Sequence, residues 1–341
     1  MRQTSPAQTL QPQRINWTAY IALVLAIVVL AFMVWLLLRN TTRIPEPTGL
    51  GRLEPVLIIE GPGTGPKPRF ARPLAAAWGL DNRIYVSDTG NSRICVFDSR
   101  GSFLSEMTGA NESAKAGKKQ RVLSQPAGLV VGDAGEVYVA DIRSGAVFVL
   151  DSSGVTTQTI APGTGSAKAP WLPTDVALVS GLLYATDSDG VAVFQTDGVP
   201  LGRLGSKGTP VELSRPNGIA EGPNESLVVS DTNAQRIASY TATGTLLWEL
   251  GPAPDGPDPF GLPRGIATSE SGTVFVADAF MFGIASISPD GQLQDVYRSR
   301  GKSPGQFEYP NDIDVADDLL LVTDKDNNRI QVLRVVDPTP R

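Results

Sequence analysis

Apolar and polar positions divide the chain into two parts with different periodicities. Between Ile15 and Leu38 no residue is charged, and the sequence YIALVLAIVVLAFMVWLLL is almost entirely apolar. As a helix, these 24 residues span about 36 Å, which is enough to cross a bilayer. We therefore predict a short tail at 1–14, a transmembrane anchor helix at 15–39 and a linker at 40–52. A cleaved signal peptide is the alternative, although its apolar core is usually only about 7 to 15 residues long.

The second part, from residue 53 onward, alternates apolar and polar residues in short runs. Examples are RIYVSD, EVYVAD and TVFVAD, and similar runs such as RICVFD, AVFVLD and RIQVL follow after tight turns. A glycine turn then leads to a further run, as in GSFLSEM, GTLLWEL and GQLQDVY. A period of two, rich in β-branched and aromatic residues, predicts β-strands. This part of the chain is therefore expected to be all-β.

The strands recur in six similar units, each with a proline followed 14 or 15 residues later by an aspartate. The units start near residues 72, 125, 172, 215, 262 and 309. The prolines are Pro73, Pro126, Pro173, Pro216, Pro263 and Pro310. The aspartates are Asp88, Asp141, Asp187, Asp231, Asp278 and Asp324. Four antiparallel strands per unit describe one propeller blade, which can bury both faces only between neighbours. We therefore predict a six-bladed β-propeller over 53–337.

The sixth unit supplies only three strands and needs a fourth from elsewhere. The segment RLEPVLIIEGPGTGPKPRFARP before the first proline is similar to QLQDVYRSRGKSPGQFEYP ahead of Pro310. A strand at 55–60 is therefore predicted to complete the sixth blade. Such a strand closes the ring and leaves no free sheet edge.

The motif V-x-D-T-x-N-x-R-I-x-V-F, with Pro-x-Gly/Asp-Ile/Val-Ala ahead of it, resembles the NHL repeat. The likeness extends over about 53–337 and implies an NHL/TolB-like six-bladed propeller. Units one, four and six keep the motif best, each with an arginine five residues after the aspartate. These structural pairs are Asp88 with Arg93, Asp231 with Arg236 and Asp324 with Arg329. Units two and five have Ala146 and Gly283 in place of the arginine, and unit three has a shortened turn.

Composition excludes several kinds of chemistry. The chain has no histidine, which removes His-dependent nucleophilic sites, His-ligated zinc and any His general base. Cys95 is the only cysteine, so neither an intramolecular disulfide nor a thiolate metal cluster is possible. Residues 1–52 contain five Arg and one Glu, which leaves 24 basic and 34 acidic residues in the remainder. An acidic surface repels phosphate backbones, so no nucleic-acid partner is expected.

The stretch DKDNN, residues 324–328, has oxygen ligands at alternate positions, as a calcium loop would. However, Arg329 follows where an EF-type loop needs other residues, and a predicted strand begins there. Asp and Asn also suit tight turns, because they bond the turn backbone and tolerate left-handed geometry. We interpret DKDNN as a turn between two strands and predict no metal site in it.

A candidate ligand site lies just after the first-strand prolines, since propellers place functional groups at the mouth of the central channel. The residues there are apolar or small in units one and two and polar in the others. The predicted ligand-binding set is Asp175, Asn217, Arg264, Asn311 and Asp312. No catalytic residue is predicted.

Two functional classes are compatible with this set. Asn217, in RPNGIA, looks similar to an asparagine of the calcium-dependent gluconolactonase-like hydrolases, which bind one calcium at the channel mouth. Against this reading, ARPLAAAW has only Ala71 and Arg72 where that family has a glutamate, and Arg264 would place a positive charge beside the cation. Calcium is therefore possible, but no cofactor is expected and an enzyme is the less favoured reading.

The favoured hypothesis is a non-catalytic binding, scaffold or sensor module for a protein, peptide or cell-envelope ligand. The resemblance to NHL propellers supports this hypothesis, because those propellers often serve as binding modules. Trp171, in the loop APGTGSAKAPWLP, is either an exposed anchor for such a partner or a residue packed between blades. The two flanks of the apolar segment carry similar numbers of arginines, and we expect the short tail inside and the propeller on the extracytoplasmic side. The protein is then a single-pass membrane protein.

Overall fold

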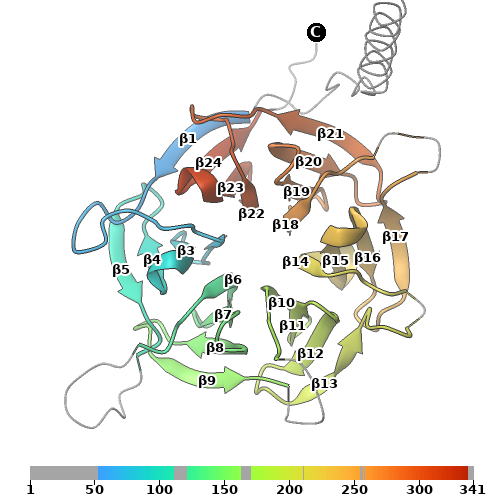
Figure 1. Ribbon diagram of the computed structural model, residues 1–341, viewed down its shortest axis with the longest axis horizontal. Helices are drawn as coiled ribbons and strands as arrows, with labels where there is room; N and C mark the ends of the chain where they lie inside the picture. Colours follow the sequence, from blue (N-terminus) through green and yellow to red (C-terminus); the bar gives the residue numbers. More distant parts are fainter. Residues whose placement is uncertain are drawn as a thin grey trace, which may run out of the picture. The chain divides into compact units, whose positions relative to one another are not determined.

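The computed structural model describes residues 53–110, 121–162, 170–209, 211–253, 256 and 258–336. The predicted tail, anchor helix and linker lie outside these residues. Within the described ranges no helix has the length and apolarity of a membrane span. The described residues form six four-stranded antiparallel sheets arranged around a centre (Figure 1). The predicted all-β, six-bladed propeller is therefore confirmed.

Each blade runs from a first strand at the centre to a fourth at the rim, as Figure 1 shows. Blade one is β2 (Ala75–Trp78), β3 (Ile84–Asp88), β4 (Arg93–Phe97) and β5 (Phe103–Met107). Blade two is β6 (Pro126–Val131), β7 (Val137–Asp141), β8 (Ala146–Leu150) and β9 (Thr156–Ile160). Blade three is β10 (Asp175–Val179), β11 (Leu182–Asp187), β12 (Gly190–Gln195) and β13 (Pro200–Leu204).

The second half of the ring repeats this arrangement. Blade four is β14 (Pro216–Gly222), β15 (Ser226–Asp231), β16 (Arg236–Tyr240) and β17 (Leu246–Leu250). Blade five is β18 (Pro263–Thr268), β19 (Val274–Asp278), β20 (Gly283–Ile287) and β21 (Leu293–Arg298). Blade six is β22 (Pro310–Ala316), β23 (Leu319–Asp324), β24 (Arg329–Val335) and β1 (Leu53–Ile59). Short 3-10 helices lie in four turns: η1 (Thr89–Asn91), η2 (Pro223–Glu225), η3 (Thr232–Ala234) and η4 (Lys325–Asn327).

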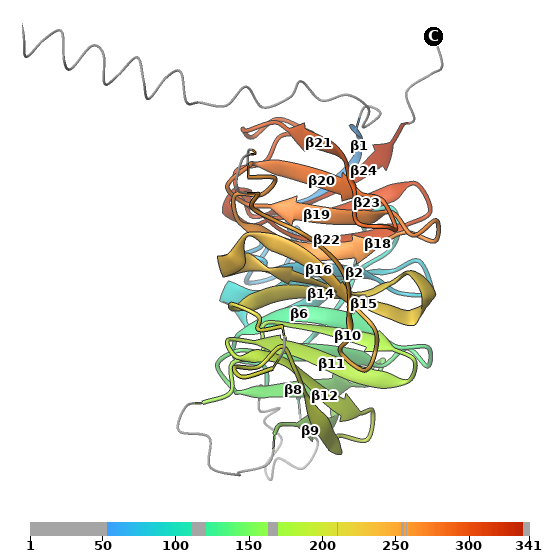
Figure 2. The ribbon, with the colours of Figure 1, turned by 90° about the vertical axis from the view of Figure 1, so that its right-hand side faces the viewer.

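The ring is closed by the pairing of β1 with β24, the outer strands of blade six. The two strands run antiparallel, from Leu53 opposite Val335 to Ile59 opposite Ile330. They lie together at one edge of the propeller when it is seen from the side (Figure 2). Because the chain's first described strand completes its last blade, separating the ends costs a whole strand pairing.

The core consists of apolar layers between neighbouring blades. The second and third strands are buried along their whole length in blades one, two and five, and the alternate residues of each strand face opposite neighbours. Val86 and Cys95, for example, pack with Ile330 and Leu321 of blade six. The buried thiol of Cys95 has its pKa raised to about 12, mainly by desolvation. Cys95 is thus a small, unreactive core residue.

The repeated aspartates tie each blade to the loop that precedes it. In blade six, Asp324 accepts backbone amides from Glu308 and Tyr309, and its other oxygen accepts Nε of Arg329 at 3.0 Å. Arg329 in turn donates to the backbone carbonyls of Lys302 and Gln306. The two side chains are almost fully buried, so the ion pair and its amide partners form one satisfied network.

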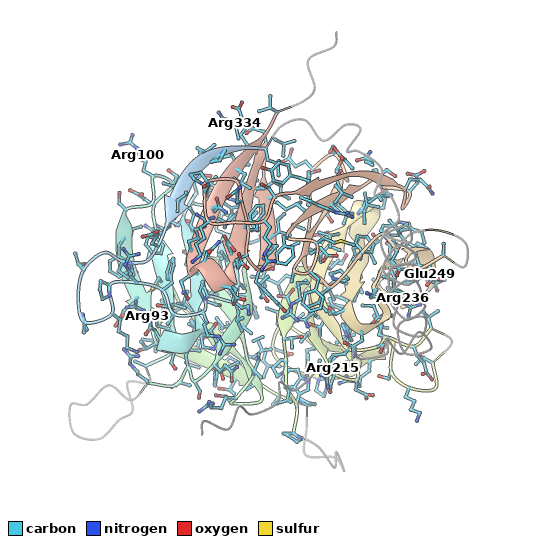
Figure 3. All side chains as sticks on the ribbon, turned by 45° about the horizontal axis from the view of Figure 1, so that its top comes forward. Arg93, Arg100, Arg215, Arg236, Glu249 and Arg334 are labelled. Atoms are coloured by element: carbon cyan, nitrogen blue, oxygen red, sulfur yellow. The ribbon has the colours of Figure 1, made fainter. Side chains whose placement is uncertain are left out.

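Blades one and four have the same aspartate–arginine pair. Arg93 donates to Asp88 at 2.8 Å and Arg236 to Asp231 at 3.0 Å. Arg236 also reaches Glu249 of the rim strand at 2.8 Å, and the two lie side by side in Figure 3. DKDNN has the same construction: η4 is the turn between β23 and β24, with the αL residue after it. It is thus a turn between two strands, as predicted.

In blade three the arginine comes from a different strand. Arg203 lies on β13, where it pairs with Ala192 of β12. Its Nη2 donates to Asp187 at 2.6 Å. The second oxygen of Asp187 accepts Nε1 of Trp171 at 2.6 Å. Trp171 also packs against Phe194 and the core between blades two and three. Of the two readings of Trp171, the packed residue is therefore correct.

Candidate functional site

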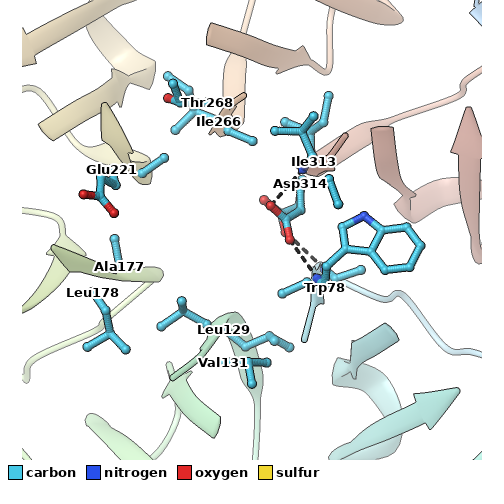
Figure 4. A pocket seen from close by; sticks show the side chains of 18 of the residues that line it. Trp78, Leu129, Val131, Ala177, Leu178, Glu221, Ile266, Thr268, Ile313 and Asp314 are labelled. Carbon is cyan, nitrogen blue, oxygen red and sulfur yellow. Dashed lines mark hydrogen bonds between the residues drawn. The ribbon is translucent and has the colours of Figure 1, made fainter. Parts of the chain in front are cut away.

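The six first strands surround a channel with two openings of unequal size. At the start of the strands, beside the prolines, the cavity measures about 90 Å³; we call this opening the narrow mouth. At the far ends of the same strands the cavity measures about 510 Å³ and forms the wide mouth (Figure 4). Asp175 and Asp312 line both cavities and mark the waist between them.

The predicted ligand-binding residues all line the narrow mouth. The lining residues are Leu74, Ala75, Ala127, Gly128, Ile142, Thr174, Asp175, Asn217, Arg264, Gly265, Asn311 and Asp312. The proline spacing therefore located the residues of one opening from the sequence. Whether they bind a ligand is a separate question, which depends on how their polar groups are used.

Several polar groups of the narrow mouth form hydrogen bonds to neighbouring blades. Arg264 donates from Nε to Oδ1 of Asn311 at 3.2 Å, which joins blades five and six. Asn311 donates from Nδ2 to the carbonyl of Leu74 at 2.6 Å, which joins blades six and one. Asn217 accepts the Thr186 hydroxyl at its backbone carbonyl, at 3.3 Å. The narrow mouth is thus partly a seam that joins neighbouring blades.

The waist aspartates are also bonded across blade boundaries. Asp175 of blade three accepts the Ile219 amide of blade four at 3.0 Å, and Asp312 of blade six accepts the Ala76 amide of blade one at 3.1 Å. Each carboxylate takes space that a glycine in the preceding blade leaves free. A Cβ atom on Gly128 would overlap Asp175. A Cβ atom on Gly265 would overlap Asp312, including its Cα atom.

Burial changes the acidity of the waist groups. Desolvation raises the pKa of Asp175 to about 7, and the Asp314 and Arg264 charges act on it with opposite signs. The pKa of Asp312 is raised well above its usual value, first by desolvation and then by repulsion from Asp175. Desolvation likewise lowers the pKa of Arg264, although the charges of Asp312 and Asp175 oppose that shift. Arg264 is therefore the countercharge of the two waist carboxyl groups.

The wide mouth is the opening that sequence reasoning missed. A ring of residues at the ends of the first strands surrounds it, each five residues after the blade's proline. These are Trp78, Val131, Leu178, Glu221, Thr268 and Val315. The proline spacing that located the narrow mouth also locates this ring, once the length of the strand is added. Leu129 and Ile266 extend the apolar wall inward (Figure 4).

Polar groups in the wide mouth are predominantly acidic. Asp314 lies on the wall, where its two oxygens accept the amides of Trp78 at 2.7 Å and Val315 at 2.8 Å (Figure 4). Desolvation raises the pKa of Asp314 to about 6. Glu221 lies at the opening, and its pKa is raised by desolvation and by the nearby Glu225. The indole of Trp78 packs away from the opening, in the core between blades six and one.

A metal centre is not apparent in either mouth. In the ranges the structure describes, no three Cys, Asp or Glu side chains form a group that could hold a metal ion. An oxygen-ligated cation such as calcium requires several such ligands together.

Comparison with known proteins is consistent with this fold. The NHL repeat model matches residues 307–333, which confirms the resemblance for the sixth unit. No curated protein sequence matches the chain significantly. The gluconolactonase of Xanthomonas campestris has a similar structure, with a TM-score of 0.61 and 16% identity over 87% of this chain and 99% of that one.

Two further structures have the same fold at low identity. Virginiamycin B lyase from Staphylococcus aureus gives a TM-score of 0.56 with 16% identity, over 78% of this chain and 81% of the lyase. Hydrazine synthase from Kuenenia stuttgartiensis gives 0.55 with 13% identity, over 81% of this chain and 99% of that chain. At such identities the similarity is one of fold. The chain is a six-bladed β-propeller whose sixth blade contains an NHL repeat.

Proposed function

We propose that this protein is a membrane-anchored, extracytoplasmic propeller that acts as a non-catalytic binding module, with the wide mouth as its binding surface. Its ligand is a protein, peptide or cell-envelope component. The contrast between the two mouths supports this assignment most directly. The narrow mouth is small and its polar groups bond neighbouring blades, whereas the wide mouth is an open cavity with an apolar wall and polar rim. Ligand sites commonly combine such walls with a few polar groups.

Membrane attachment depends on the predicted anchor helix at 15–39, whose uncharged run from Ile15 to Leu38 is long enough to span a bilayer. A single anchor followed by a linker at 40–52 would hold the propeller close to the membrane. The outward orientation is the arrangement we favour for a short basic tail, although the flanking arginines are nearly balanced.

A calcium-dependent, gluconolactonase-like hydrolase is the second candidate. The structural similarity to the Xanthomonas campestris gluconolactonase favours it, together with Asn217 at the narrow mouth. Arg264 argues against it, because its guanidinium lies in the same mouth and bonds Asn311, another residue a calcium ion would need. The structure of a related lyase describes a His→Ala variant as catalytically inactive. This chain has no histidine, so it cannot share a mechanism that needs one.

Site-specific photo-crosslinking tests the proposed binding surface. A photoreactive amino acid is placed at Leu178 or Val131 of the wide mouth in the full chain, expressed in its own membrane. Matched variants carry it at Leu74 or Thr174 of the narrow mouth. We expect one discrete adduct from both wide-mouth positions and none from the narrow-mouth positions, with competition by excess unmodified protein.

Adducts from the narrow mouth alone would overturn the assignment of the binding surface. The hydrolase is tested in parallel with lactone and phosphotriester substrates in calcium. Calcium-dependent turnover that is lost in Asn217→Ala would overturn the non-catalytic assignment. Protease digestion of sealed membrane vesicles of known orientation tests which side the propeller occupies.

A further inference from the structure

We infer that the ligand of the wide mouth contains an organic cation, an ammonium or guanidinium group on an apolar body. This inference rests on the proposed function, since it specifies the ligand class of that surface. It is carried by the combination of a large cavity, an apolar wall and charges of a single sign.

Among the described residues, every ionisable side chain that lines the wide mouth is acidic. These residues are Asp175, Glu221, Glu270, Asp312, Asp314 and Asp317. Neither lysine nor arginine is among the described residues that line it. Arg264, which compensates the two waist aspartates, lines the narrow mouth only. Clefts lined by one sign of charge focus the potential and concentrate ions of the opposite sign.

The acidic groups differ in depth. Asp314 is held on the wall by two backbone amides, so its carboxylate has a fixed position and still has free lone pairs. Glu221 lies near the end of β14, Glu270 and Asp317 follow β18 and β22, and all three side chains are exposed. A cationic group that enters the cavity therefore meets exposed carboxylates first and the backbone-bonded carboxylate of Asp314 further in.

The apolar wall defines the rest of the ligand. Leu129, Val131, Leu178 and Ile266 provide aliphatic surface between the carboxylates (Figure 4). A cavity of about 510 Å³ is in the size range of small-molecule sites. The methylenes of a lysine side chain or an arylalkyl amine would lie against this wall, and their burial adds about 25 cal/mol per Å².

A bare metal ion fits the same charges less well. The described carboxylates come from blades three to six and do not converge as a coordination sphere. An organic ammonium group with several N–H donors can bond such dispersed acceptors at once.

Calorimetric titration of the full chain in detergent micelles at pH 8 tests this inference with three probes that share a phenylethyl group. They are 2-phenylethylamine, 2-phenylethanol and 3-phenylpropionate, which are cationic, neutral and anionic. We expect the amine to bind at least about tenfold more tightly than the alcohol, a difference of about 1.4 kcal/mol, and the carboxylate not to bind. The variant Glu221→Gln/Asp314→Asn should lose most of the preference for the amine. The control Glu249→Gln, on the rim strand β17, should keep it and corrects for partition into detergent.

A second arm distinguishes the sources of the cation. Acetyl-Phe-Lys-amide presents the same groups as part of a peptide, so tighter binding than 2-phenylethylamine indicates a peptide ligand. Equal binding of the three phenyl probes, or an unchanged preference in the double variant, would overturn the inference. If wide-mouth crosslinks form while the amine does not bind, this inference is wrong and the proposed binding surface stands. If neither is observed, both are wrong.

Discussion

The two mouths of the channel are built from opposite ends of the same six strands, yet they differ in almost every physical respect. At the narrow mouth Arg264 and Asn311 bond each other and the next blade, and little space is left. At the wide mouth the same strands surround a cavity more than five times larger, and none of the described residues that line it is basic. Joining the blades and binding a ligand are thus assigned to different ends of the channel.

Two aspartates of β22 illustrate the difference on a single strand. Asp312 and Asp314 both accept an amide from blade one, at Ala76 and Trp78. Asp312 lies at the waist beside Gly265, close to the compensating charge of Arg264. Asp314, two residues further along, faces only the wide cavity. The same residue type therefore serves mainly the ring at one position and is available to a ligand at the other.

The largest effect is expected from Gly265→Ala at the waist. The new Cβ atom would overlap both the carboxylate and the Cα atom of Asp312, so neither neighbour can move without shifting a strand. We expect the free energy of unfolding to fall by about 1–3 kcal/mol in urea denaturation. Ser271→Ala, in an exposed turn, is the control and should change it by less than about 0.5 kcal/mol. A fully stable Gly265→Ala variant would show that the waist is not closely packed.

Removal of the countercharge should have a smaller effect that depends on pH. Arg264→Met keeps an unbranched apolar stem but removes the guanidinium group, which leaves Asp175 and Asp312 without their nearby cation. We expect a loss of about 1–2 kcal/mol in the free energy of unfolding at pH 8. At pH 4 the loss should be smaller, because both carboxyl groups are then protonated. Equal losses at both pH values would contradict the assigned role of Arg264.

Stability of the wild-type protein should decline as the pH rises from about 4 to 7. The folded-state pKa values of Asp175 and Asp314 are raised, to about 7 and about 6, so the folded state retains protons that the unfolded chain has released. A group with a raised pKa contributes stability below its unfolded pKa and loses it through the folded value. Melting temperatures across this range should show the decline. Asp175→Asn should flatten the curve, and an unchanged curve in that variant would be contrary to expectation.

The smallest effect is expected from calcium. If the narrow mouth is a seam between blades, calcium and then chelator should move the melting temperature by less than about 1 °C, because no ion binds the folded state preferentially. Asn217→Ala should leave this result unchanged. A calcium-dependent rise of several degrees in the melting temperature that is lost in Asn217→Ala would instead support a calcium-dependent hydrolase site at the narrow mouth.

The fold could be predicted because the same sequence pattern occurs in six successive units. Six prolines and six aspartates at constant spacing give the number of blades, and the alternation in runs such as RICVFD gives the strands. The narrow mouth followed from the same spacing. The wide mouth did not follow from the prolines alone, because the residues around it lie five positions further along, at the other end of each first strand.

Other features depend on contacts that no local pattern contains. Arg203 replaces the missing arginine of blade three only because β13 pairs with β12 in a register that brings it to Asp187. From the sequence, Trp171 could be either an exposed anchor or a residue packed between blades. The hydrogen bond from its indole N–H to Asp187 supports the packed position. Both hydrogen bonds join residues 16 positions apart, so they depend on tertiary structure and no local sequence pattern predicts them.

The measurement that tests the central claim most directly uses cysteine modification at the two mouths. The native thiol, Cys95, is buried and unreactive, so Leu178→Cys and Leu74→Cys each introduce one reactive site, at the wide and narrow mouths. Modification rates are measured with cationic and anionic methanethiosulfonates of similar size. We predict that the cation-to-anion rate ratio, relative to free cysteine, is at least about tenfold higher at position 178 than at position 74. Equal ratios, or a higher ratio at position 74, would contradict the assignment of an open, negatively charged binding surface to the wide mouth.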